Sequence, residues 1–416
     1  ISDNLKDYES GHYYFYSGLM DAFTGHTKPE RTEPNKLFKN VGNSVFMDVT
    51  EEVGLIDQTW SGDATILDVD QDGWLDLYVL NMQGNDKYYR NVGGIYFEED
   101  PYVFGKTPWG SMGIKVFDYD NEGSLDVFVT DMHSDMYENL EPDMEKFKSR
   151  VKWADSFLMD GGNSIFGNAF YRYSEQGIYE EISDDLLLEN YWPWGPSVGD
   201  INADGYDDIF VTASMNYPFR YAVNNVFLNE KGITFRNSEF ILGVEPRVDW
   251  NTATPWFKID CSGKDSSHQD CIKDKAKDMN TVWGASGSRS SVIFDMDLDG
   301  DLDIIISDFN SNPMVLKSNL TDKTEVHYLK IDLIGTDSNR NGVGSIVKVY
   351  SEGKVYTKFV DGKSGYLSQS ILPLYFGLDR SETVEKIEIF WTSGVKQTLE
   401  GPLETNNVIE VIEHRN

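Results

Sequence analysis

Four stretches of the chain place acidic residues, in one case with an asparagine between them, at alternate positions, followed by a glycine and then a further aspartate. They are DVDQDGWLDLYV from Asp68, DYDNEGSLDVFV from Asp118, DINADGYDDIFV from Asp200 and DMDLDGDLDIII from Asp295. In a tight turn, the side chains at the first, third, fifth and ninth positions point to one side and converge. Ionised carboxylates so close together repel one another. A divalent cation with about six to eight oxygen ligands reverses the sign of that energy, and calcium tolerates irregular geometry better than magnesium.

We therefore predict about four calcium ions, one in each loop, held by side chains at those positions and by the backbone carbonyl of the seventh residue. The predicted ligands are Asp68, Asp70, Asp72, Trp74 and Asp76; Asp118, Asp120, Glu122, Ser124 and Asp126; Asp200, Asn202, Asp204, Tyr206 and Asp208; and Asp295, Asp297, Asp299, Asp301 and Asp303. Simple Asx turns are the alternative, but four copies in phase, each before a strand-like run, favour a cation. An EF-hand is excluded because its twelfth position needs a glutamate. That position holds Val79, Val129, Val211 and Ile306.

The elements that must position these loops are strands. Each loop follows a Trp or Gly-rich entry and precedes a short β run, and three are then followed by a second hairpin. This order predicts an all-β fold, an integrin-α-like β-propeller of four-stranded antiparallel blades. A further hairpin near Leu37 is expected to complete the last blade and close the ring, with a stacked solenoid as the alternative. The blade number stays open, up to seven, because segments 131–195 and 240–283 are long enough for degenerate blades or insertions.

The pattern changes from about His327, where alternating runs without Asp loops predict a separate small β domain. The expected organisation is an N-terminal extension over 1–34, a calcium-binding propeller over 35–322 and a β domain over 323–416. Inserts are expected near 136–160, where the spacing is partly helical, and near 245–282.

The Asp loops resemble FG-GAP (VCBS-like) repeats, the calcium-loop blades of integrin-α-like propellers. The C-terminal stretches HYLKIDLIGTDSNRNGVGSIVKV, GYLSQ, YFGL and IEIFWTSGVKQTL resemble the ASPIC/UnbV domain. This pairing is similar to the cartilage acidic protein family and its bacterial relatives. The resemblance implies a secreted or periplasmic calcium-bearing propeller, with relatives linked to cell–matrix adhesion or to bacterial natural-product pathways. Glu122, where the repeat usually has Asp or Asn, and the cysteine-bearing insert depart from that pattern.

The composition limits the classes of partner that the protein can bind and the cellular compartment in which it can function. The 416 residues include 70 acidic and 36 basic side chains, a net charge of -34, which argues against a nucleic-acid partner. No apolar run approaches the roughly 20 residues that span a membrane. Cys261 and Cys271 enclose a hydrophilic loop and predict one disulfide in an oxidising compartment, with two thiols in a cytosolic protein as the alternative. Asn319, in an Asn-Leu-Thr sequence, accepts a glycan only in a eukaryotic host.

A partner surface is expected on the face opposite the Asp loops, where the second strand of each blade ends. Adaptable and aromatic side chains recur there and would suit a protein or a glycan, the alternative being packing between blades. They are Trp60, Met82, Trp109, Met132, Trp194, Met215, Trp283 and Phe309. Met132, His133 and Met136 could also be soft copper ligands, although a solvated histidine is the more common outcome.

No catalytic motif accompanies these features: the sequence contains no GxSxG elbow, HExxH helix or glycine-rich phosphate loop. In the C-terminal domain we interpret Arg340, Tyr366 and Gln369 as turn and hydrogen-bonding residues first. The sequence therefore favours a binding or adhesion module. The alternatives are an enzyme or enzyme partner that uses the propeller funnel, and a structural subunit of an oligomeric extracellular assembly.

Overall fold

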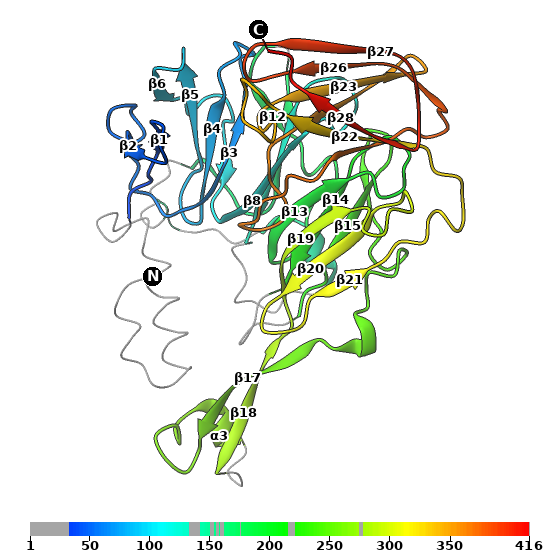
Figure 1. Ribbon diagram of the computed structural model, residues 1–416. Coiled ribbons are helices and arrows are strands. Elements are labelled where there is room, and N and C mark those ends of the chain that lie inside the picture. Colours follow the sequence, from blue (N-terminus) through cyan, green and yellow to red (C-terminus); the bar gives the residue numbers. More distant parts are fainter. Residues whose placement is uncertain are drawn as a thin grey trace.

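Residues 33–132, 142–149, 154, 158, 162–174, 176–214, 221–273 and 278–415 are described by a computed structural model (Figure 1). The predicted all-β fold is confirmed. Four antiparallel sheets follow one another along the chain, and their first strands lie side by side, β3 beside β8, β8 beside β13 and β13 beside β19. These sheets are the propeller-type blades.

Each blade begins with two strands joined by an Asp loop. The first contains β3 (Ser61–Leu67), β4 (Asp76–Asn81), β5 (Lys87–Val92) and β6 (Tyr96–Glu99). The second contains β8 (Ser111–Phe117), β9 (Asp126–Asp131), β11 (Ala169–Tyr173) and β12 (Tyr179–Glu181). The third contains β13 (Pro193–Gly199), β14 (Asp208–Ala213), β15 (Asn225–Asn229) and β16 (Phe235–Asn237). The fourth has three strands, β19 (Ser288–Phe294), β20 (Asp303–Asp308) and β21 (Met314–Leu316).

The second strands lie in the core. Every residue of β9 and β14 is buried, because each of these strands is covered on both faces by neighbouring blades. This explains why their sequences, DVFVTD and DIFVTA, lack the polar alternation of a half-exposed strand. Each first strand contains a register shift near its start, at the end remote from the Asp loop.

The prediction that the N-terminal hairpin completes the last blade is wrong. Among the described strands, β1 (Phe38–Asn40) and β2 (Phe46–Asp48) pair only with each other. The segment after them joins the first blade instead, where the Phe97 N–H of β6 donates to the Val53 carbonyl at 2.8 Å. Leu37 and Val53, which flank the hairpin, pack against Tyr89 and Phe97 of that blade. The hairpin is therefore held by the first blade, which follows it directly in the sequence.

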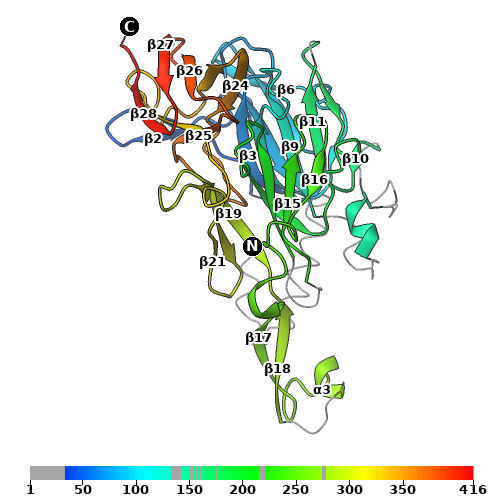
Figure 2. The ribbon, with the colours of Figure 1, turned by 90° about the vertical axis from the view of Figure 1, so that its right-hand side faces the viewer.

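The two long inserts form no further four-stranded blade among the described residues. The first supplies η3 (Pro142–Lys146) and a two-residue parallel pairing of β7 (Thr107–Pro108) with β10 (Ser164–Ile165). The second forms η4 (Val248–Trp250), β17 (Ala253–Asp260), α3 (Gln269–Lys273) and β18 (Met279–Ala285). The β17–β18 hairpin projects from the blades as an arm (Figure 2). The predicted Cys261–Cys271 disulfide closes its tip, with the two Cα atoms 5.3 Å apart.

The strands after residue 327 form two packed sheets. One has the order β25-β22-β28, from β22 (Tyr328–Ile334), β25 (Leu374–Gly377) and β28 (Asn407–Ile412). The other has the order β24-β23-β26-β27, from β23 (Ile346–Ser351), β24 (Lys354–Phe359), β26 (Thr383–Phe390) and β27 (Lys396–Glu404). Their shared core includes Leu329, Val347, Val349, Ile387 and Trp391. Among the described residues, no helix has the length and apolar character that a membrane span requires.

The C-terminal domain docks on the Asp-loop end of the blades, and in Figure 1 its strands lie above β13–β15 and β19–β21. Its Tyr375 hydroxyl donates to the carbonyl of Gly300 in the fourth Asp loop at 2.9 Å. Residues 361–370, which we call the axial loop, reach the first strands of all four blades. Their partners are Asp63 in β3, Lys115 in β8, Pro196 in β13 and Ser291 in β19. Within the described ranges no hydrogen bond joins the first sheet to the fourth, so the axial loop links them.

Candidate functional site

All four Asp loops share one backbone geometry. The first aspartate accepts a hydrogen bond from the N–H of the glycine at the sixth position. The N···O distances are 3.0 Å for Asp68, 2.8 Å for Asp118, 2.8 Å for Asp200 and 2.9 Å for Asp295. The glycines have φ between 89° and 100°, a range that residues with a side chain rarely adopt. The repeated sequence therefore folds into one repeated turn.

The ninth aspartate connects three parts of each blade, a role that the sequence analysis missed. Its Oδ2 accepts the N–H of the second loop residue, Val69, Tyr119, Ile201 or Met296. Its Oδ1 accepts an N–H from the third strand or the residues after it, that of Asn91, Tyr173, Asn229 or Ser318. Asp76, Asp126, Asp208 and Asp303 are all buried. The signal was present in the sequence, since this aspartate recurs at the first position of every second strand.

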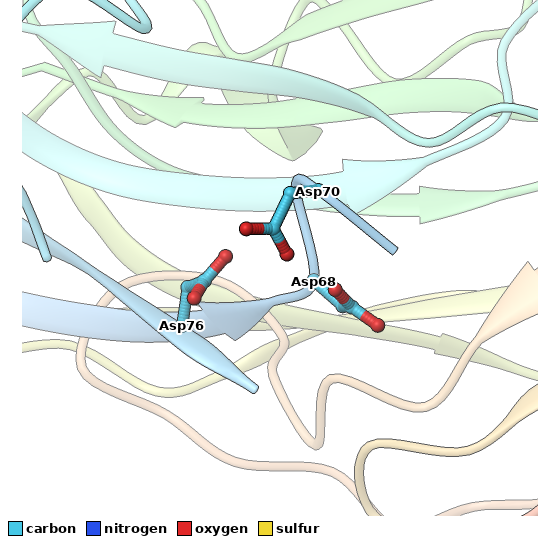
Figure 3. A group of neighbouring side chains, drawn as sticks. All are labelled: Asp68, Asp70 and Asp76. Carbon is cyan, nitrogen blue, oxygen red and sulfur yellow. The ribbon is translucent and has the colours of Figure 1, made fainter. Parts of the chain in front are cut away.

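Three of the loops bring carboxylates into one small group. Asp68, Asp70 and Asp76 each offer an oxygen, and these oxygens lie within 4.8 Å of one another. Figure 3 shows the carboxyl groups of Asp70 and Asp76 turned toward each other, with Asp68 beside them. Asp118, Asp120 and Asp126 form the second group, and Asp295, Asp297 and Asp299 form another in the fourth loop. In the third loop the Asn202 amide instead donates to Asp204 at 3.1 Å.

The electrostatics of the first two groups oppose ionisation. Two ionised carboxylates at 4.8 Å repel by about 3 to 4 kcal/mol at an effective dielectric constant of about 20. Burial, together with neighbouring aspartates, raises the pKa of Asp68 to about 6. Burial raises the pKa of Asp118 to about 7, and it raises the pKa of Asp126 well above its usual range.

These two groups fit a hard cation. The Oδ1 atoms of Asp68 and Asp118 are buried and have no hydrogen-bond partner. A buried carboxylate oxygen without a donor is costly, and an oxygen-ligated cation supplies the missing interaction. Asp118 is only 2% exposed, so this oxygen has no access to bulk water.

The remaining predicted ligands lie around the loops in different ways. Asp72, like Asp120 of the second group, accepts a backbone N–H bond from the residue two positions later in its own loop. Glu122 is exposed, and Trp74 is 49% exposed with its ring against Gly94. Asp301 accepts two bonds from Thr321, so its side chain contacts the segment after the blade. The part of Asp301 predicted to bind calcium is its backbone carbonyl, as for Trp74, Ser124 and Tyr206.

The opposite ends of the second strands also share a hydrogen bond. Met82, Met132, Ser214 and Phe309 donate their N–H to the carbonyls of Trp60, Gly110, Trp192 and Gly287. The position equivalent to Met82 in the third blade is therefore Ser214. Met215, His133 and Met136 lie outside the described residues. The aromatic residues are less regular: Trp109 is buried near Phe166, and Trp283 belongs to β18 of the arm, where it is 56% exposed.

One cluster on this face joins the third blade, the fourth blade and the axial loop. The guanidinium of Arg289 lies 4.0 Å from the Trp194 ring centroid and 5.1 Å from that of Phe309. Tyr366, which we interpreted as a structural residue, meets Trp194 edge-on at 5.0 Å. Trp194 is buried, whereas Phe309 is 38% exposed. Only part of the predicted aromatic surface therefore faces solvent.

Comparisons with known proteins agree with this architecture. The family model for ASPIC and UnbV matches residues 335–416. A model for an FG-GAP-like repeat matches residues 68–129, and one for the FG-GAP repeat matches residues 192–228. A comparison with curated proteins found no match. FG-GAP repeats are typical of extracellular binding modules. The chain is therefore a protein of FG-GAP repeats with a C-terminal ASPIC and UnbV domain.

Proposed function

We propose that the protein is an extracellular or periplasmic calcium-binding module whose Asp loops hold structural calcium. The observation that carries this proposal is the pair of buried, unpartnered oxygens of Asp68 and Asp118 within repeated carboxylate groups. When bound, calcium would offset the repulsion among the carboxylates and join the first two strands of a blade. All candidate ligands are oxygens, and the backbone carbonyl at the seventh position suits the irregular coordination that calcium accepts.

Thermal unfolding of the chelated 416-residue chain, with and without added calcium, tests this proposal. Sites of extracellular type have Kd values of about 10⁻⁴ to 10⁻³ M. Calcium at roughly a hundredfold above Kd adds about 2.7 kcal/mol per site to the free energy of unfolding, so Tm should rise clearly. Magnesium at equal concentration should give a smaller rise.

Matched variants make that test specific. Asp118→Asn should reduce the calcium-dependent rise in Tm, whereas Asp322→Asn, at an exposed position outside the loops, should leave it unchanged. An identical melting curve in chelator and in calcium would count against structural calcium.

The compartment is the second part of the proposal. The Cys261–Cys271 disulfide supports an oxidising environment, since such bonds are rare in reducing ones. Protein isolated from its native source should therefore contain no alkylatable thiol when it is unfolded without reductant. Two free thiols would place the protein in a reducing compartment.

The binding role is proposed for the face opposite the Asp loops, because the C-terminal domain covers the loop face. Phe309 and Trp283 expose large apolar area there, as interface residues commonly do. Screening of immobilised matrix proteins and glycans, with Phe309→Ala and Trp283→Ala, tests this face. Both substitutions should weaken any captured ligand, and Tyr102→Ala, at an exposed aromatic position after β6, should not. Equal loss in all three would exclude this surface.

A further inference from the structure

The four Asp loops divide into two pairs by what the first carboxylate contacts. In the first and second loops the Oδ1 atoms of Asp68 and Asp118 have no partner. In the third loop, Oδ1 of Asp200 accepts the N–H of Asp204 at 3.0 Å. In the fourth loop, Oδ1 of Asp295 accepts the N–H of Asp299 at 3.1 Å. The chain itself therefore uses in the second pair the oxygen that it leaves open in the first.

A lysine of the C-terminal domain reaches the fourth loop. The Lys330 amine, in β22, contacts Oδ2 of Asp295. The Lys330 side chain is 10% exposed and the Asp295 side chain is fully buried, so the pair is shielded from water. Lys317, which follows β21, contacts Asp297 in the same group. Two ammonium groups thus already lie on the carboxylates that would otherwise receive a cation.

The third loop is compensated in a related way. Lys358, in β24, forms an ion pair with Asp207, the neighbour of the ninth-position aspartate, and its amine lies 2.7 Å from Oδ2. Both side chains are largely buried. The third position of this loop is Asn202, which carries no charge and whose amide donates to Asp204. The first, third, fifth and ninth positions of this loop therefore hold three carboxylates, one fewer than in the first loop, and Lys358 pairs with the additional carboxylate of Asp207.

The first and second loops differ from the other two in their basic neighbours. Among the described residues, no lysine forms an ion pair with their carboxylates. In the first loop Arg90, 39% exposed, forms an ion pair with Asp70 at 3.7 Å and another with Asp100. Beside the second loop, the Lys348 amine lies 3.5 Å from the carbonyl of Gly123. Their negative charge remains available to a cation from solution.

We propose that calcium occupies only the first and second Asp loops, and that Lys330 and Lys358 of the C-terminal domain act as built-in counter-ions for the fourth and third. The inference rests on the proposed function, because it says which of the same Asp loops bind calcium. It follows that lysines of the docked C-terminal domain neutralise carboxylates of the third and fourth loops, whereas calcium neutralises those of the first and second. The chain then binds two calcium ions, although its sequence contains four loops.

Equilibrium dialysis with labelled calcium on the chelator-treated 416-residue chain tests the inference. The wild-type protein should bind two equivalents. Asp118→Asn should reduce this to one, and Asp299→Asn in the fourth loop should leave it at two. Lys330→Met should raise it to three by freeing Asp295. Lys396→Met, at an exposed ion pair in β27 away from the loops, is the matched control and should leave it at two.

The outcomes separate the inference from the proposed function. Three or four equivalents in the wild type, or two in Lys330→Met, would overturn the division while leaving calcium binding intact. No bound calcium in the wild type would remove the proposed function itself. Lys330→Met should also melt lower than the wild type in chelator, because Asp295 loses its buried partner, and added calcium should restore Tm. If this variant does not fold, the wild-type count and the Asp118→Asn and Asp299→Asn pair still decide.

Discussion

At the residue scale, the first and ninth aspartates of an Asp loop differ in what their oxygens contact. In the first loop, Oδ2 of the first aspartate accepts one backbone N–H and its Oδ1 has no partner, whereas both oxygens of the ninth accept backbone N–H groups from the loop and from the third-strand segment. The spacing in the sequence predicted that both would converge, and for Asp68 and Asp76 they do. It could not assign the second role, because the N–H of Asn91 belongs to a strand fifteen residues away.

The ninth aspartate should stabilise the fold even without calcium. In the third loop, Asp208→Ala removes acceptors from the N–H groups of Ile201 and Asn229, and unpaired buried groups cost about 1 to 3 kcal/mol each. We expect a loss of about 2 to 5 kcal/mol in the free energy of unfolding, measured by urea denaturation in chelator. Asp204→Ala, at a partly exposed position in the same loop, should cost clearly less; equal costs would contradict the assigned role.

Asp86 predicts a pH dependence that is separate from the Asp loops. Burial raises its pKa to about 8, although it accepts bonds from the Asn81 N–H, the Ser111 hydroxyl and the Tyr78 hydroxyl. Blades two and three have an asparagine in the same hydrogen bond, Asn168 or Asn224. A neutral side chain is therefore sufficient at this position.

The raised pKa of Asp86 fixes the sign of the effect. Between the unfolded pKa near 3.8 and the folded value near 8, unfolding releases a proton, so the free energy of unfolding falls as pH rises. Asp86→Asn should remove this fall in the free energy of unfolding. The variant should therefore be more stable than wild type at pH 8, by at most about 1.4 kcal/mol per pKa unit. Denaturation at pH 5 and pH 8 measures it. A slope unchanged by Asp86→Asn, or reproduced by exposed Asp184→Asn, would refute it.

At the element scale, the sequence predicted the strands that flank each Asp loop better than the place of the outer hairpins. The second strands are apolar throughout and follow a repeated turn, so local pattern determines them. The hairpin around Leu37 has the same pattern as a blade's outer pair, which suggested closure of the ring. Its position depends instead on contacts of Val53 with the first blade, and hairpin pattern alone does not specify a partner sheet.

The register shift at the start of the first strands predicts a sharp contrast between two glycines. A Cβ at Gly195 in β13 would lie 2.1 Å from the backbone nitrogen of Tyr366 in the axial loop. Gly62 lies in the corresponding shift of β3, where the nearest atom is the flexible Met82 side chain at 3.1 Å. Gly195→Ala should therefore displace the axial loop and exceed the roughly 1 to 3 kcal/mol typical of overpacking. Gly62→Ala should cost less; similar Tm values for the two variants would contradict this.

At the scale of the whole molecule, the sequence indicated two units but not how they meet. In the sequence, Lys330, Lys358 and Lys363 stand at strand and loop positions where a lysine is usually exposed to solvent. Their aspartate partners lie 35, 151 and 300 residues away in the chain. Pairings at such separation depend on how the C-terminal domain docks on the blades, and no periodic pattern in the sequence predicts them. The division of the Asp loops into two pairs was therefore beyond the reach of sequence spacing.

The same docking predicts that the blades and the C-terminal domain unfold together. The axial loop touches the first strand of every blade, and its Lys115–Asp361 pair, with 2.8 Å between the amine and Oδ1, is largely buried. Opening this interface exposes both charges and the inner strands at once, so partial unfolding costs nearly as much as complete unfolding. Calorimetry of the 416-residue chain should show one transition, coincident with loss of near-ultraviolet circular dichroism. A chain ending at residue 322 should lack a cooperative transition even in calcium, because the first and fourth sheets then lose the loop that links them. Two separate transitions, or a well-folded truncated chain, would mean that the blades fold stably without the C-terminal domain.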